Sequence, residues 1–304
     1  MPSLVIIGSG PAGLTAAVYA ARGAIQTRVV EGTGPGGQLM LTTDVENFPG
    51  FPTPLKGPDL MALMKKQAVR FEVEFISGDA TRVDFASVPL KIEVNGITYQ
   101  ADSVIVATGA TSRWLGLESE KRFRGKGVSS CATCDGYFFK NKDVVVVGGG
   151  DTAIEEAIFL SNIARKVTVI HRRDELRCAK MIQERAFRNG RISFLWSSVV
   201  EEILGSARVQ GVRVRDLRTG RIYDYSCDGV FIAIGHIPNT EIFRGQLELD
   251  EAGYIRAQNR TETSQKGVFA AGDVVDRIYR QAVTAAGSGC QAALDVIRYL
   301  RSGT

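Results

Sequence analysis

The chain has 304 residues, enough for about two domains of ordinary size. Apolar residues make up 44% of it and charged residues 23%, which is ordinary globular usage and excludes a disordered or low-complexity protein. The net charge of +4 is spread along the chain, so we expect neither a nucleic acid nor a membrane surface as its partner.

The sequence also predicts a cytoplasmic protein. No apolar run approaches the roughly 18 residues of a spanning helix, and the start MPSLVIIGSG lacks the charged beginning and long apolar stretch of a signal peptide. Five cysteines are an odd number in a long chain, which is not typical of a secreted disulfide framework. In a reducing compartment, a close cysteine pair is expected to be metal-binding or catalytic.

The first predicted elements form a nucleotide-binding unit. The apolar run 4–7 is typical of a buried parallel strand, and Gly8, Gly10 and Gly13 then give G-x-G-x-x-G at the start of a predicted helix. Glycine suits these positions because the turn is tight and a pyrophosphate must approach the backbone closely, while the helix N-terminus offers N–H groups to the anion. A second strand ends at Glu31, 23 residues past Gly8, where a carboxylate can accept hydrogen bonds from ribose hydroxyls.

Further elements extend this unit along the chain. A helix is predicted over 58–71 and a β meander over 79–100, in which Asn95-Gly96 favours a hairpin turn. The apolar run 103–110 then predicts a buried strand that ends near a glycine. Strand, glycine turn, helix, strand and acid together are typical of a dinucleotide-binding fold.

The next feature is CATCDG, which contains Cys131 and Cys134. Zinc needs four ligands, and beyond this pair the chain has only isolated cysteines and two histidines, which disfavours a metal site. A disulfide this short closes almost no loop, so it stabilises little, and a structural disulfide does not persist in a reducing cytosol. We therefore favour reversible redox chemistry, in which one thiolate attacks an external disulfide and the other resolves the mixed disulfide.

A second glycine turn follows the cysteine pair. Gly148, Gly150 and Ala153 stand after an apolar strand in the same pattern as the glycines of the first turn. The residue 23 positions past Gly148 is His171 rather than an acid. The two sites are therefore expected to differ in the ribose that they accept.

Arginines follow this histidine at Arg172, Arg173 and Arg177. A guanidinium fork suits a phosphate and a carboxylate repels one, so the second site is predicted to bind a 2′-phosphorylated nucleotide, NADP. The first site is predicted to bind an unphosphorylated ribose, as in FAD or NAD. The alternative is that HRRDELR is simply the charged start of a helix.

The second unit repeats the rest of the first. A helix is predicted over 179–189, a meander over 207–225 and a closing strand over 229–239, and the chain then adds a strand over 267–275 and a long final helix. The last 65 residues are too few for a third core, so we expect them to complete the first domain. The predicted fold is α/β, with two Rossmann-like domains and the second inserted into the first. The predicted domains are 1–112 and 242–304 for FAD, and 113–241 for NADPH with the redox dithiol.

These motifs resemble a known family. The order GSGPAG, GGQL with TTDVENFPG, CATCDG, GGGDTA with HRR, and FAAGDV with YRQA resembles the low-molecular-weight, bacterial-type thioredoxin reductases over about residues 4–300. The resemblance implies a homodimeric flavoprotein that transfers electrons from NADPH through FAD and a Cys131–Cys134 disulfide to thioredoxin. It also implies that the inserted domain rotates about its two connections to present nicotinamide and disulfide alternately.

The resemblance also assigns residues. For FAD it implies Gly8, Gly10, Ala12, Gly13, Glu31, Gly32, Gly37, Gln38, Asn47, Gly272, Asp273, Arg280, Gln281 and Ala282. For NADPH it implies Gly148, Gly150, Asp151, Thr152, Arg172, Arg173 and Arg177. Many members have asparagine at position 151, so the Asp151 charge is expected to weaken phosphate binding slightly. With Cys131 and Cys134, Asp135 is expected to be catalytic as a general acid/base, although an Asp-Gly surface turn also explains it.

Three other functions share parts of this pattern. A flavin dithiol oxidase has the same cysteines but does not need the arginines, and a hydroperoxide-reductase flavoprotein usually carries an extra N-terminal redox domain, which we do not expect ahead of Leu4. A nucleotide-responsive flavoprotein without turnover does not need a dithiol. The remaining cysteines, Cys178, Cys227 and Cys290, are expected to be small buried hydrophobic residues.

Overall fold

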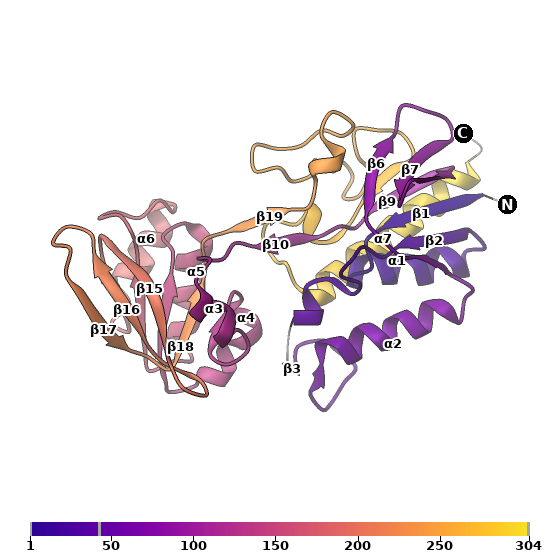
Figure 1. The fold of residues 1–304 in the computed structure, drawn as a ribbon. Helices are drawn as coiled ribbons and strands as arrows, with labels where there is room; N and C mark the ends of the chain where they lie inside the picture. Colours follow the sequence, from indigo (N-terminus) through magenta and orange to yellow (C-terminus); the bar gives the residue numbers. More distant parts are fainter. Residues whose placement is uncertain (1, 42–43, 303–304) are drawn as a thin grey trace. The chain divides into compact units, whose positions relative to one another are not determined.

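The computed structural model describes residues 2–41 and 44–302. The chain forms two compact units (Figure 1). Unit 1 comprises Met1–Thr111 and Ile237–Thr304, and unit 2 comprises Ser112–His236. Because unit 2 lies within the sequence of unit 1, the chain passes between them twice, at β10 (Ala110–Ser112) and β19 (His236–Pro238), which pair with each other.

Unit 1 is built on a five-stranded parallel sheet with the order β20-β9-β1-β2-β5. Its strands are β1 (Ser3–Ile7), β2 (Gln26–Val30), β5 (Glu74–Ile76), β9 (Ser103–Val106) and β20 (Val268–Ala270). Helices α1 (Pro11–Arg22) and α7 (Ala282–Arg301) pack on one face in a core that includes Ala16 and Ala292. The meander β6 (Ala80–Asp84), β7 (Leu90–Val94) and β8 (Ile97–Ala101) contributes to the core on the other face.

Unit 2 repeats this plan with a parallel sheet of order β11-β18-β12-β13-β14. Its strands are β11 (Val128–Ser129), β12 (Asp143–Val147), β13 (Lys166–Ile170), β14 (Ile192–Leu195) and β18 (Gly229–Ile232). Helices α5 (Asp151–Ser161) and α6 (Lys180–Phe187) pack on one face, and residues of the meander β15 (Ser198–Gly205), β16 (Val209–Asp216) and β17 (Ile222–Ser226) enter the core on the other. The predicted α/β class, with a second Rossmann-like unit inserted into the first, is confirmed.

The described residues include further helices, strands and turns. These are β3 (Asp44–Val45), β4 (Leu55–Lys56), α2 (Gly57–Val69), α3 (Glu118–Phe123), α4 (Ala132–Asp135) and the 3₁₀ turns η1 (Gly37–Leu41), η2 (Gly136–Phe139), η3 (Glu241–Phe243) and η4 (Gly272–Val274). The second meander begins at Ser198, earlier than the predicted start at 207, because SVVEEILG forms a strand whose apolar residues only partly alternate with polar ones. The predicted hairpin turn at Asn95-Gly96 is confirmed by the pairing of β7 with β8 and by positive φ at both residues.

The register of the two sheets brings the predicted nucleotide-contacting residues to corresponding places. Ile7 pairs with Val30 in unit 1, and Val147 pairs with Ile170 in unit 2. The residues that follow these strand ends therefore lie at the same carboxyl edge of their sheet, which is where parallel α/β sheets bind ligands. Residues 23 positions apart in the sequence, Gly8 and Glu31 in unit 1 and Gly148 and His171 in unit 2, therefore follow adjacent strand ends.

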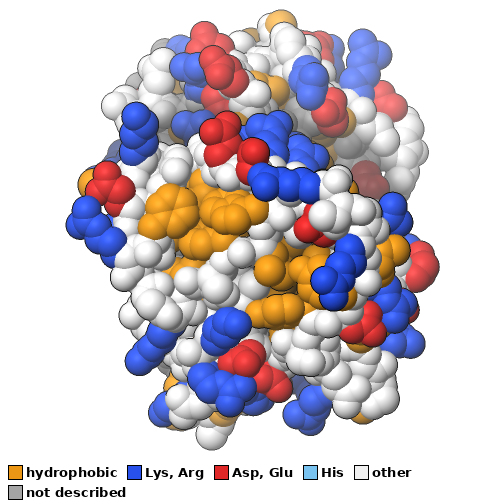
Figure 2. All heavy atoms as spheres, turned by 90° about the vertical axis from the view of Figure 1, so that its left-hand side faces the viewer, with side chains coloured by type: hydrophobic (Ala, Val, Ile, Leu, Met, Phe, Trp, Pro, Cys, Tyr) orange, Lys and Arg blue, Asp and Glu red, His pale blue; other side chains and the backbone are white. Residues whose placement is uncertain are grey.

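Helices long and apolar enough to cross a membrane do not occur in the described parts of the chain. Figure 2 shows basic and acidic side chains interspersed over one face, with hydrophobic side chains gathered in patches between them. This distribution agrees with the spread of charge along the sequence.

Candidate active site

The first glycine turn joins β1 to α1 and leaves room for an anion. Gly8 has φ of +115°, and a Cβ on Gly13 would lie 1.9 Å from the Gly8 carbonyl oxygen, so both positions require glycine for backbone reasons. A Cβ on Gly10 would meet nothing within 4 Å. The N-terminus of α1 has no side-chain cap and no acidic residue in its first turn. The turn therefore offers open space and backbone N–H groups where a phosphate is expected.

Ser9 holds the loop after β2 against this turn. Its buried hydroxyl donates a hydrogen bond to the Glu31 carbonyl oxygen at 2.8 Å and accepts one from the Gly36 N–H at 3.0 Å. Gly37 has φ of +66°, and a Cβ on it would lie 3.7 Å from the Gly10 Cα. The sequence analysis did not predict this role, because Ser9 fills a variable position of the glycine motif. A small polar residue at that position could have indicated a hydrogen bond to the neighbouring loop.

The predicted ribose acceptor, Glu31, lies at the end of β2 and is 8% exposed. Its Oε1 is 2.5 Å from the Nζ of Lys65, which comes from α2. The neighbouring Gly32 has φ of +79° and donates its N–H to the Gly78 carbonyl oxygen. The carboxylate is therefore held between two elements, and Lys65 is a partner of Glu31 that the sequence did not indicate.

Residues from two segments of unit 1 meet at the start of α7. Gln281 caps this helix in a capping box with Thr284, and its Oε1 accepts a hydrogen bond from the Nδ2 of Asn47 at 3.4 Å. Arg280 has φ of +47°, and its N–H donates to the Asp276 carboxylate at 3.0 Å. The predicted flavin-contacting residues Asn47, Arg280 and Gln281 are thus brought together, while Ala282 begins the helix. Thr42 and Thr43 of the TTDVENFPG motif lie outside the described residues.

Asp273 lies in the turn η4 beside this segment. Burial, and secondly the negative charge of Asp276, raise the pKa of Asp273 to about 6, although the Arg280 charge opposes the shift. Its neighbour Gly272 has φ of +79°, and a Cβ there would lie 2.9 Å from the Ala12 side chain. Gln38 is exposed in η1. The raised pKa marks a partly desolvated carboxyl group in the region where the resemblance implies flavin contacts.

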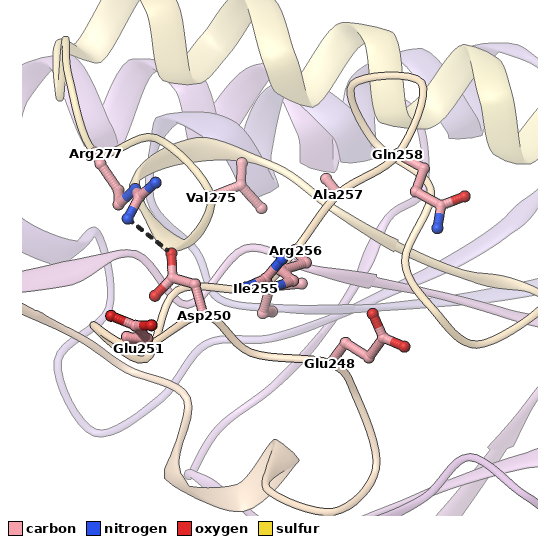
Figure 3. Close-up of a pocket in the computed structure, with 9 residues that line it drawn as sticks. All are labelled: Glu248, Asp250, Glu251, Ile255, Arg256, Ala257, Gln258, Val275 and Arg277. Atoms are coloured by element: carbon pink, nitrogen blue, oxygen red, sulfur yellow. Dashed lines mark ion pairs between the residues drawn. The ribbon is translucent and has the colours of Figure 1, made fainter.

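A cavity of about 490 Å³ is lined in part by Val275 and Arg277, which precede Arg280 in the chain (Figure 3). It is lined by Glu248, Asp250, Glu251, Ile255, Arg256, Ala257, Gln258, Val275 and Arg277. Asp250 accepts backbone N–H groups of its own turn and forms an ion pair with Arg277 at 3.2 Å. The cavity contains none of the predicted site residues, but the ion pair anchors the chain three residues before Arg280.

The second glycine turn joins β12 to α5 in unit 2. Gly148 has φ of +153°, and a Cβ there would lie 2.4 Å from the Ala233 carbonyl oxygen and 2.7 Å from the Ala153 Cβ. A Cβ on Gly150 would meet nothing within 4 Å. Thr152 follows in the first turn of α5. This turn repeats the close strand–helix approach and the open space of the first one.

His171 lies beneath this turn, at the position that corresponds to Glu31. It is 4% exposed, and a Cβ on Gly149 would lie 2.4 Å from its ring. Burial, followed by the positive charge of Arg177, lowers the pKa of His171. A neutral imidazole in place of an acid removes the repulsion that a carboxylate would exert on a phosphate.

The three predicted phosphate ligands follow this histidine and are exposed. Arg172, Arg173 and Arg177 form no ion pair with any residue that the structure describes. The Arg177 N–H donates to the Gly149 carbonyl oxygen at 2.8 Å, and the Arg173 carbonyl oxygen accepts the Ser197 N–H at 3.0 Å. The backbone of this segment is fixed beside the glycine turn while its guanidinium groups remain available to an anion.

Cys131 and Cys134 form a disulfide with 5.3 Å between their Cα atoms. Cys131 precedes the short helix α4 and is half-buried, whereas Cys134 is exposed. The Ser129 hydroxyl accepts the Cys131 N–H at 3.0 Å and donates to the Cys131 carbonyl oxygen at 3.3 Å. The Cys131–Cys134 disulfide that the resemblance implied is therefore present, and the buried Ser129 side chain is hydrogen-bonded to the backbone of Cys131.

Asp135 is partly buried next to the disulfide. Burial raises its pKa, while a hydrogen bond from Ser129 opposes that rise. Its N–H donates to the Cys131 carbonyl oxygen at 3.1 Å. A carboxyl group with a raised pKa on the residue directly after Cys134 is suited to hold a proton for a departing thiolate.

The disulfide helix packs near the far end of α5 rather than near the glycine turn. A Cβ on Gly136 would lie 3.1 Å from Leu160 and 3.3 Å from Phe159, which belong to the last turn of α5. An α-helix rises about 1.5 Å per residue, so roughly 15 Å of helix separate this contact from the turn. Next to the disulfide, Tyr137 and Phe138 are 65% and 40% exposed. The disulfide therefore lies beside an apolar surface of unit 2.

The remaining cysteines are not part of this site. Cys178 and Cys227 are buried, and burial raises the pKa of Cys227 to about 12, which agrees with a role as small hydrophobic residues. Cys290 is only half-buried, so the expectation of a buried residue was wrong there. Within residues 2–41 and 44–302 there is no cluster of three or more His, Cys, Asp or Glu side chains suited to hold a metal ion.

Known proteins resemble this chain along nearly its whole length. A family model described as pyridine nucleotide-disulphide oxidoreductase matches residues 2–289. The thioredoxin reductase of Rickettsia prowazekii (strain Madrid E) is 54% identical over 302 residues, which cover 98% of this chain and 97% of that protein. The thioredoxin reductase of Coxiella burnetii (strain RSA 493 / Nine Mile phase I) is 52% identical over 309 residues, covering 99% and 97%.

Solved structures agree. The crystal structure of thioredoxin reductase from Streptococcus pyogenes MGAS5005 has a TM-score of 0.93 and 43% sequence identity, and the match covers 98% of both chains. Thioredoxin reductase from Giardia duodenalis has a TM-score of 0.94 at 43% identity and covers 99% of this chain. The similarity therefore includes both units and the segments that connect them.

Proposed function

Because the chain belongs to the pyridine nucleotide-disulphide oxidoreductase family, we propose that it is a thioredoxin-disulfide reductase that transfers electrons from NADPH through FAD to oxidised thioredoxin. The observation that carries the proposal is that the Cys131–Cys134 disulfide lies on unit 2, which also contains the second glycine turn and the exposed arginines that follow β13. The whole-length identity of 52–54% to thioredoxin reductases supports the choice of acceptor.

The residues present fit the two cofactors. In unit 1, the open space at Gly10 and the uncapped start of α1 suit the pyrophosphate of FAD, and Glu31 suits an unphosphorylated ribose. In unit 2, the open space at Gly150 and the exposed guanidinium groups of Arg172 and Arg173 suit the 2′-phosphate of NADPH. When bound, the nicotinamide and the flavin together supply the electron pair that opens the Cys131–Cys134 disulfide.

The reduced cysteine pair then completes the exchange. One thiolate attacks a sulfur of the thioredoxin disulfide, forming a mixed disulfide and releasing a thioredoxin thiolate. The second thiolate attacks the mixed disulfide, which restores the Cys131–Cys134 bond, releases the other thioredoxin thiol and leaves thioredoxin reduced by two electrons. Asp135 supplies a proton to a departing thiolate, which its raised pKa favours.

The surface around the disulfide suits a protein substrate. Tyr137 and Phe138 expose aromatic surface within four residues of Cys134, and exposed aromatic side chains are enriched at protein interfaces. A homodimer in the cytoplasm is part of the same proposal, by similarity to the family.

Replacement of Cys134 by serine tests the proposal. The Cys134→Ser protein should retain its flavin absorbance and its reduction by NADPH but lose NADPH consumption driven by oxidised thioredoxin. Cys290→Ser is the matched control, because Cys290 lies in unit 1 outside the disulfide, and it should turn over thioredoxin normally. Thioredoxin-dependent turnover that survives in Cys134→Ser would refute the dithiol mechanism.

A further inference from the structure

We propose that Lys65 is a positioning residue for the adenosine side of the unit 1 cofactor site, where it fixes the orientation of the Glu31 carboxylate, the predicted ribose acceptor. The inference rests on the proposed function only in taking FAD as the ligand. It concerns an ion pair between two elements, and nothing in the glycine motif or in the order of motifs indicates it.

The geometry of the pair is specific. The Nζ of Lys65 lies 2.5 Å from Oε1 of Glu31 and 4.7 Å from the ring centroid of Phe75. Glu31 ends β2, Lys65 is in the second half of α2, and Phe75 is in β5. The ammonium group thus contacts both a carboxylate and an aromatic ring, which limits where it can move.

The burial of the two partners is unequal. Glu31 is 8% exposed, whereas the Lys65 side chain is 43% exposed. A carboxylate this far from water is costly to keep ionised unless a cation or hydrogen bonds compensate it. Lys65 supplies that cation while its own stem remains partly in solvent, so its replacement removes compensation from Glu31 without opening a core cavity.

The pair leaves one oxygen of Glu31 for a ligand. Oε1 is taken by Lys65, and Oε2 accepts no hydrogen bond from any residue that the structure describes. A ribose diol needs an ionised acceptor in a fixed orientation. An ion pair on one oxygen fixes the plane of the carboxylate, and the other oxygen is then available to the hydroxyl groups.

Lys65 therefore acts on the ligand through Glu31, and a double-mutant cycle isolates that coupling. FAD affinity is measured by titrating flavin-stripped protein and following flavin fluorescence, and FAD release is followed from the loaded protein after dilution. We expect Lys65→Met to weaken FAD binding about tenfold, from the loss of one charge-assisted contact. Lys65→Arg should restore most of the affinity, because it keeps a cation at the same position.

Two further variants make the test decisive. In a Glu31→Gln background, Lys65→Met should change FAD affinity less than about twofold, because the charge on which Lys65 acts is gone. Lys66→Met, an equal charge change on the adjacent exposed residue, should leave affinity unchanged.

The outcomes distinguish this inference from the proposed function. Equal losses from Lys65→Met with and without Glu31, or no loss in either, would overturn the positioning role while FAD-loaded wild-type protein still supported the proposed function. Wild-type protein that binds no FAD would contradict the proposed function and this inference together.

Discussion

The Asp151 carboxylate accepts a hydrogen bond from the backbone N–H of Ala179 at 2.9 Å. Asp151 is the first residue of α5 and Ala179 is the N-cap of α6, so the bond joins the starts of two helices. Arg172, Arg173 and Arg177 lie on the chain between these two helices. Asp151 thus stabilises the segment that carries the guanidinium groups, although its own charge disfavours the phosphate that they are expected to bind.

Replacing Asp151 separates these two effects. Asp151→Asn keeps an acceptor for the Ala179 N–H and removes the negative charge near the helix N-terminus, so we expect NADPH to bind about two- to fivefold more tightly. Asp151→Ala loses the hydrogen bond as well and should bind NADPH more weakly than Asp151→Asn. Titration of NADPH fluorescence measures both, with Glu184→Gln on α6 as a control for a distant charge change. Weaker binding in Asp151→Asn would show that the ionised form is needed.

The glycines of the first turn should respond differently to alanine. A Cβ on Gly10 meets open space at an ordinary φ of −73°, so Gly10→Ala should fold with nearly unchanged stability but lose FAD affinity on the order of tenfold, the equivalent of about 1.4 kcal/mol. A Cβ on Gly13 would lie 1.9 Å from the Gly8 carbonyl oxygen, so Gly13→Ala should lower the free energy of unfolding by about 1–3 kcal/mol. Denaturant unfolding and FAD titration of both variants check this contrast, which equal effects on stability would contradict.

The sequence predicted the glycine turns and the residue that ends or follows the next strand of each unit, because a short stretch of chain connects the two. Gly8 and Glu31 belong to one strand–helix–strand unit, and so do Gly148 and His171, so a fixed spacing implies a fixed place. The partners of these residues could not be predicted in the same way. Lys65 reaches Glu31 from a helix that starts 26 residues later, and no local pattern records such a contact.

The position of the disulfide shows the same limit. In the sequence, CATCDG lies close before the second glycine turn, which places the dithiol in the same domain as that turn but does not give the distance between them. In the structure, Gly136 packs against Leu160 at the opposite end of α5, because β12 runs the length of the sheet between them. The role of Ser129 was not predicted either, because it depends on a hydrogen bond between its hydroxyl, at the end of β11, and the Cys131 N–H.

The arginine segment should determine the choice of pyridine nucleotide. Arg172→Ala combined with Arg173→Ala removes two exposed guanidinium groups that form no ion pair within the described residues, so the fold should be unaffected. Loss of two charge-assisted contacts should weaken NADPH on the order of 100-fold and NADH by far less. Steady-state kinetics with both nucleotides measures the change, and Arg188→Ala, whose partner is the exposed Glu184, is the control. Equal losses for NADPH and NADH would contradict the 2′-phosphate assignment.

The pH dependence of turnover should depend on Asp135. Burial raises the pKa of this carboxyl group, so its protonated form persists above the usual range and is lost as pH rises through the raised value, which sets the falling limb of thioredoxin-dependent kcat/KM. Because Ser129 opposes the rise, Ser129→Ala should move that limb to higher pH, whereas Ser129→Thr should not. Asp135→Asn should remove the limb and slow turnover about 100-fold or more. By linkage, the free energy of unfolding should fall as pH rises from the ordinary aspartate pKa to the raised one, and Asp135→Asn should abolish that part of the fall. A limb that stays in place in Ser129→Ala would exclude Asp135 as the titrating group.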